Sequence, residues 1–107
     1  MSKLDFLMRS TTKAQLESFQ KLKEGWDSYN GKTIGVSAIA SAESMILLII
    51  SLIGVEPYPV PMNDGGVQLE FPYNGLDYEI EIDPNGEVTN WAAFDVTGEV
   101  FHQYEKK

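Results

Sequence analysis

The chain has 107 residues and a net charge of −8, and 43% of its residues are hydrophobic. This length gives one domain with its own core and is too short for two. The absence of cysteine excludes a disulfide framework, a thiolate nucleophile and a zinc–thiolate site, and it suits a reducing compartment. Because "MSKLDFLMRS" also lacks the apolar run of a secretory signal, we expect a cytoplasmic protein.

The charge is divided unevenly along the chain. Residues 1–53 hold six Lys and Arg against five Asp and Glu, whereas residues 54–107 hold two against eleven. No Lys or Arg occurs between positions 54 and 105. Neutralising phosphates requires Lys and Arg, so we expect no direct nucleic-acid binding through this half.

The first half has helical periodicity. Thr12 and Gln15 form a capping-box pattern at the start of a helix that Gly25 would end. The polar loop that follows contains Trp26 and Tyr29, and we expect both rings to anchor it to the core.

A second helix is predicted from Ser37, a favourable N-cap, to Ile53, just before Gly54. A membrane-spanning helix needs about 20 apolar residues, and polar residues interrupt the only such stretch. We therefore predict a helix buried by the sheet and the other helix, and no membrane association. A homodimer formed through the spare face of residues 45–53 is the alternative.

After the proline-punctuated stretch at 56–66, which we expect to be an extended linker, the apolar period changes to two. Four strands are predicted, at about 66–72, 76–83, 87–94 and 99–105. The fold class is therefore α+β, with two main helices packed on one face of a four-stranded antiparallel β-meander. Residues 1–107 form one domain, made of a helical half (1–53) and an acidic β-meander (54–107).

Three glycine-containing turns set the register of the predicted meander. The two-residue Asn-Gly turn pairs Tyr73 with Leu76, and two type I turns closed by a glycine bulge pair residue 83 with 87 and residue 95 with 99. One face then collects the apolar residues, together with Asn90 and His102, and would pack on the helices. The other face collects nine carboxylates. A bulge at residues 89–91 would change this partition locally.

The acidic face is the candidate site. Carboxylates two residues apart lie about 6.8 Å from one another and repel by about 0.6 kcal/mol in bulk water. Aromatic rings among charged groups are typical of binding anchors, and an acidic face steers a basic partner. A face selected only for solubility is the alternative. The candidate partner-binding residues are Glu70, Asp77, Glu79, Glu81, Asp83, Glu87, Trp91 and Phe101.

No catalytic residue, metal site or cofactor is predicted. The stretch "DPNGE" lacks the ligand spacing of a calcium loop, and no nucleophile-elbow, phosphate-loop or zinc-protease motif occurs. The single histidine, His102, falls on the predicted core face. An open sheet face also lacks the cleft that acid–base chemistry needs, so we expect a protein without enzymatic activity.

Two stretches, "GWDSYNGKTI" and "PYPVPMNDGGVQLEF" with the following "YEIEID", cover most of residues 24–83. They resemble a family of small, uncharacterised bacterial and phage proteins with a W-D-x-Y element before a helix and a proline-rich segment leading into a G-G-V-x-L-E-[FW] strand. The resemblance implies a prokaryotic or mobile-element origin, and it carries no established activity and no catalytic residues.

Together these features predict a non-enzymatic acidic binding protein of phage or mobile-element type. It would inhibit or neutralise a protein partner by covering a basic, nucleic-acid-binding surface, as an anti-CRISPR-like inhibitor, an antitoxin or an immunity protein would. The partner would be a nuclease, a toxin or a nucleic-acid-binding complex. The alternative is a structural module that dimerises through the apolar helix at 45–53.

Overall fold

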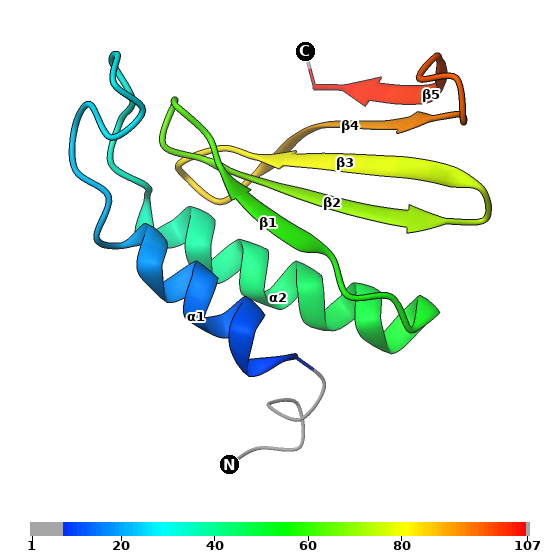
Figure 1. Cartoon of the computed structure of the whole chain (residues 1–107), viewed down its shortest axis with the longest axis horizontal. Coiled ribbons are helices and arrows are strands. Elements are labelled where there is room, and N and C mark those ends of the chain that lie inside the picture. Colours follow the sequence, from blue (N-terminus) through cyan, green and yellow to red (C-terminus); the bar gives the residue numbers. More distant parts are fainter. Residues whose placement is uncertain (1–7, 107) are drawn as a thin grey trace.

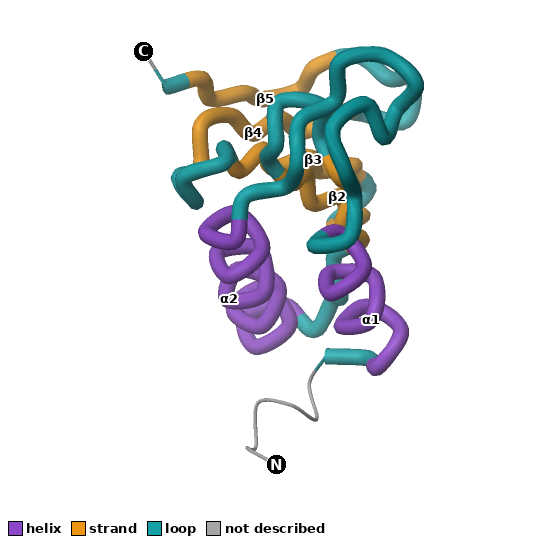
Figure 2. The backbone as a smooth tube through the Cα atoms, turned by 90° about the vertical axis from the view of Figure 1, so that its left-hand side faces the viewer, coloured by secondary structure: helices purple, strands orange, loops and turns teal. Residues whose placement is uncertain are grey.

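The computed structural model describes residues 8–106 and has two layers, helices on one side and an antiparallel sheet on the other (Figures 1 and 2). The sheet has five strands in chain order, β1-β2-β3-β4-β5. The predicted α+β class is confirmed, and the predicted strand number of four is corrected to five. The elements are α1 (Ser10–Phe19), α2 (Val36–Ile53), β1 (Tyr58–Pro61), β2 (Val67–Tyr73), β3 (Leu76–Ile82), β4 (Val88–Phe94) and β5 (Val100–Glu105).

The additional strand, β1, lies inside the predicted linker. Its residues Pro59 and Pro61 pair with Leu69 and Val67 of β2. Proline is tolerated in an edge strand where its missing N–H would have faced solvent. Because β1 is at the edge of the sheet, the prolines that indicate a linker in the sequence are compatible with strand structure here.

The start of α1 is fixed by a tertiary contact and not by the predicted capping box. Thr12 is buried, and its hydroxyl donates to Oε2 of Glu56 at 3.0 Å. Oε1 of the same carboxylate accepts the backbone N–H of Arg9, the N-cap residue, at 2.6 Å. Glu56 therefore ties the first turn of α1 to the segment that enters β1, and the helix ends well before Gly25.

The second helix forms the centre of the core, and its C-terminal end is the predicted one. Gly54 closes α2 in the left-handed conformation, at φ 72°, whereas the N-cap is Gly35 and not Ser37. α2 is the one helix among residues 8–106 that is long and apolar enough to cross a membrane by length and composition, a test that core helices also pass. One side of it packs into the core while Leu48 and Leu52 are exposed; the buried residues are Ala38, Ile39, Ala42, Ile46 and Ile49.

Backbones touch where three loops meet at one end of the sheet. A Cβ atom on Gly66 would lie 2.1 Å from the carbonyl oxygen of Ile82, and one on Gly35 would lie 2.3 Å from that of Pro84. Trp26 anchors the loop between the helices, since its indole N–H donates to the Lys32 carbonyl at 2.7 Å. The predicted second anchor is wrong, because the Tyr29 side chain is 86% exposed.

Candidate functional site

The hairpin of β2 and β3 has the predicted register. Tyr73 pairs with Leu76 across the Asn-Gly turn, and Glu70 lies directly opposite Glu79. Paired residues share a face of the sheet, so the carboxylates of β2 and β3 alternate with the buried Leu69 and its neighbours. Glu70, Asp77, Glu79 and Glu81 therefore all lie on the face that points away from the helices.

A bulge in β4 corrects the predicted position of Trp91. The register shifts between Glu81 and Ile82, which leaves Thr89 without a direct partner, pairs Glu81 with Asn90 and pairs Ile80 with Trp91. A shift of one residue exchanges the two faces of a strand. Trp91 therefore lies on the helix-side face and is not an anchor among the carboxylates, and Asn90 takes its place on the acidic side.

A second register shift falls at the start of β5. Ala93 pairs with His102 and Phe94 pairs with Val100, so Phe101 is the unpaired residue of the bulge, and its side chain is 67% exposed. His102 lies on the helix-side face as predicted, but it is exposed and not part of the core. Its ring lies 5.3 Å from that of Trp91, between centroids, in a tilted arrangement.

Asp83 caps the turn between β3 and β4. One of its carboxylate oxygens accepts the backbone N–H groups of Asn85 and Glu87, at 3.0 and 2.9 Å. Asp95 caps the next turn in the same way, and hydrogen bonds from the Thr97 hydroxyl and amide lower its pKa. These contacts give Asp83 a structural role, and the hydrogen bonds to the turn backbone are enough to explain an Asp at this position.

Glu87 belongs to an ion pair at the end of the sheet. Its carboxylate binds the amine of Lys106, and this hydrogen bond raises the pKa of the lysine. The sequence did not reveal this pair, because residues 87 and 106 become neighbours only once β4 and β5 are aligned. Glu87 is therefore already partly neutralised, unlike the carboxylates in the middle of β3.

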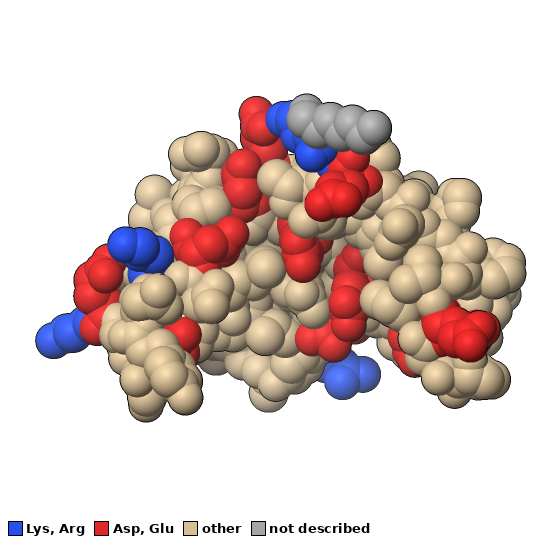
Figure 3. Space-filling view, turned by 90° about the horizontal axis from the view of Figure 1, so that it is seen from above, with Lys and Arg blue, Asp and Glu red and all other residues tan. Residues whose placement is uncertain are grey.

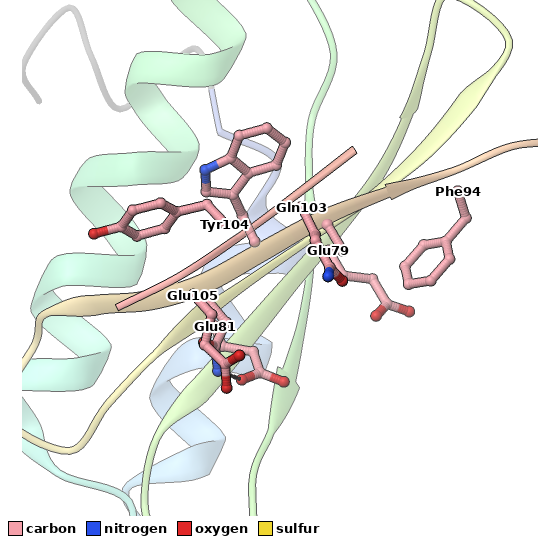
Figure 4. Close-up of a pocket in the computed structure, with 9 residues that line it drawn as sticks. Glu79, Glu81, Phe94, Gln103, Tyr104 and Glu105 are labelled. Carbon is pink, nitrogen blue, oxygen red and sulfur yellow. Dashed lines mark hydrogen bonds between the residues drawn. The ribbon is translucent and has the colours of Figure 1, made fainter. Parts of the chain in front are cut away.

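We call the side of β2–β5 that points away from the helices the acidic face. Two open hollows of about 260 and 430 Å³ lie on it, and Glu79 and Phe94 line both. Figure 4 shows Tyr104 on the opposite side of the strands from Glu81 and Glu105. The residues of the acidic face are Gln68, Glu70, Pro72, Asp77, Glu79, Glu81, Asn90, Ala92, Phe94, Val100, Gln103 and Glu105.

Glu79 is at the electrostatic centre of the acidic face. Partial burial raises the pKa of this carboxyl group, and the negative charges of Glu70, Glu81 and Asp77 raise it further. In the view from above, Asp and Glu side chains run through the middle of the molecule while most Lys and Arg lie at its margins (Figure 3). Within residues 8–106 no group of three or more Asp, Glu or His side chains is arranged to hold a metal ion.

The raised pKa of Glu79 leads to a prediction about stability. Its protonated form is favoured by folding, so its charge destabilises the fold above its folded-state pKa, and this cost disappears as the pH falls below the unfolded value. We expect Glu79→Gln to stabilise the protein near pH 7 and to lose that advantage near pH 4. Urea denaturation at both pH values measures the difference, with Glu24→Gln, an exposed loop position, as the control.

Comparison with models of protein families, with curated proteins and with solved structures gives no significant match. The function is therefore inferred from the residues and geometry of the acidic face.

Proposed function

We propose that this chain is a non-enzymatic binding protein whose acidic face covers a basic surface of a partner protein. The carboxylates of β2 and β3 would occupy positions that the partner uses for nucleic-acid phosphates. The observation that carries the proposal is the placement of Glu79, a partly buried carboxylate with like-charged neighbours on both sides along β3 and across on β2.

Electrostatic strain of this kind favours a cationic partner. A Lys or Arg about 4 Å from a carboxylate gains about 1 kcal/mol in bulk water and about 4 kcal/mol near a protein surface that partly excludes solvent. It would also relieve the repulsion that Glu70, Asp77 and Glu81 exert on Glu79. The chain supplies no such cation nearby in sequence, since residues 54–105 contain no Lys or Arg.

Phe94 supplies the apolar element that the sequence assigned to Trp91. Phe94 of β4 pairs with Asp77 of β3, and it lines both hollows of the acidic face. An aromatic side chain inside a charged surface excludes water from the surrounding ion pairs when a partner covers it. Phe94 is therefore the anchor we assign to this face, with the exposed Phe101 near its edge.

Proteins of this kind inhibit or neutralise nucleases, toxins or other nucleic-acid-binding complexes. An anti-CRISPR-like inhibitor, an antitoxin or an immunity protein encoded by a phage or mobile element and acting in the cytoplasm is the class that we propose. Each of these roles requires binding alone, and the acidic face with its two open hollows offers a surface for it.

Capture from a lysate of the source organism at increasing salt tests the proposal. Tagged protein should retain a basic, nucleic-acid-binding protein at about 0.05 M salt and release it well before 1 M, because screening shortens the Debye length from more than 10 Å to about 3 Å. Nucleic acid added in excess should compete for the same partner. A captured protein that resists both salt and nucleic acid would contradict charge mimicry.

A second function is favoured by the exposed side of α2. Leu48 and Leu52 are 51% and 72% exposed on a helix with one charged residue, Glu43. In this function two copies would dimerise through residues 45–53. Sedimentation equilibrium showing a monomer at high protein concentration would remove it.

A further inference from the structure

The two edges of the sheet differ in how they are protected. The β1 edge is four residues long, contains two prolines and contacts α1. The β5 edge is longer, and all six of its residues are exposed, including Phe101 and Tyr104. An edge without proline or covering elements presents unpaired backbone groups to any extended chain.

The direction of the free backbone groups follows from one hydrogen bond. The amide of Lys106 donates to the carbonyl of Thr89 at 2.7 Å, so residue 106 points its backbone groups toward β4. Backbone groups alternate in direction along a strand. The amides of Gln103 and Glu105 therefore point away from β4, toward the open side of β5.

The two faces beside this edge have different chemistry. On the acidic face, Gln103 and Glu105 continue the side that Glu81 occupies on β3. On the helix-side face, Trp91 pairs with Tyr104; the Tyr104 side chain is exposed and that of Trp91 is half-buried, and the main contacts of α2 with the sheet are to β2 and β3. In a strand added to β5, every second side chain would face the carboxylates of the acidic face. The side chains between them would face the aromatic rings on the helix side.

We propose that β5 accepts an extended segment of the basic partner as a further strand of the sheet. This inference rests on the proposed function, from which it takes the positive charge of the partner. Strand addition gives affinity through main-chain hydrogen bonds and specificity through alternate side chains. The occupant should alternate Lys or Arg, facing Glu105 and its neighbours, with bulky apolar residues that pack on Tyr104 and Trp91.

A second copy of this chain is a poorer occupant of the edge. Each copy carries a net charge of −8. Joining two β5 strands would place the two acidic faces in one continuous sheet, where their carboxylates repel. The charge beside the edge therefore favours a cationic strand.

The experiment uses a capped heptapeptide, about one strand in length, with Lys at odd and Val at even positions. Its control has the same composition with all Lys before all Val, and therefore the same charge. We expect the alternating peptide to slow amide hydrogen exchange at Gln103 and Glu105, and to bind at least about tenfold more tightly than the block peptide.

Two variants of one residue separate the backbone from the side chain. Gln103→Pro removes the outward N–H without removing a hydrogen bond to β4, and should reduce binding of the alternating peptide to that of the block peptide. Gln103→Ala keeps the N–H and should therefore retain the preference for the alternating peptide over the block peptide. The exchange measurement on the unmodified protein stands even if Gln103→Pro does not fold.

Other results would overturn the proposal. Equal binding of both peptides, without protection at Gln103 and Glu105, would show attraction by charge alone and would leave the acidic-face function standing. Protection of these amides that depends on protein concentration, without peptide, would make a second copy the occupant. The edge site and the acidic face can also fail separately: if Glu79→Lys with Glu81→Lys leaves both the protection by the peptide and the affinity for the partner unchanged, the edge site stands and the acidic-face function is contradicted.

Discussion

Gly66→Ala is expected to unfold the protein or to lower its free energy of unfolding by about 3 kcal/mol or more, a large part of the 5–15 kcal/mol typical of a domain. The added Cβ would lie 2.1 Å from the Ile82 carbonyl oxygen. The backbone of residue 66 cannot shift easily to relieve this contact, because its N–H donates to Asp64 at 2.8 Å and its carbonyl accepts the Met62 N–H at 2.9 Å. The clash is therefore with the backbone of β3 itself.

Urea denaturation followed by circular dichroism measures this effect, and Gly75→Ala is the matched control. Gly75 has a φ of 76°, and a Cβ there would meet nothing within 4 Å. The control should cost about 1–2 kcal/mol, the usual penalty of a left-handed conformation for a residue with a side chain. Equal losses for the two variants would show that close backbone packing at Gly66 does not hold the loops to β3.

The parts of the fold that the sequence predicts are those set by local chemistry. The end of α2 follows from a long apolar run and a glycine that takes the left-handed conformation after it. The β2–β3 register follows from the Asn74-Gly75 turn, which pairs the residues beside it. Both signals act within a few residues, so no tertiary contact was needed to interpret them.

The parts that were mispredicted depend on contacts between distant segments. Thr12 belongs to a capping pattern in the sequence, but it meets Glu56 only after β1 has folded beside α1. The prolines of β1 indicate a linker until their strand is known to be an edge. In each case a local preference gave way to a tertiary arrangement that a single sequence does not display.

The candidate site was predicted in part for the same reason. Four carboxylates of β2 and β3 have the predicted face because a tight turn sets their register. Trp91 does not, since a bulge at Thr89 reverses the alternation and no glycine marks its position. Asp83 and Glu87 satisfy a turn and an ion pair, roles that compete with partner binding and become visible only through their hydrogen bonds.

Charge reversal on β3 tests the central claim, that the acidic face binds a basic partner. Glu79→Lys with Glu81→Lys changes the middle of the face, where Glu70 lies opposite Glu79. The matched control reverses two exposed residues outside the sheet, Glu17 and Glu24. Each Glu→Lys change adds two charges, so both double variants change the net charge from −8 to −4.

The measurement is the dissociation constant, by calorimetry at low salt, for the partner recovered by capture. We expect the β3 variant to remain folded and to bind at least about 100-fold more weakly, which is about 2.8 kcal/mol at about 1.4 kcal/mol per tenfold. The control should bind within about threefold of the unmodified protein. Equal affinity of the two variants would contradict the claim.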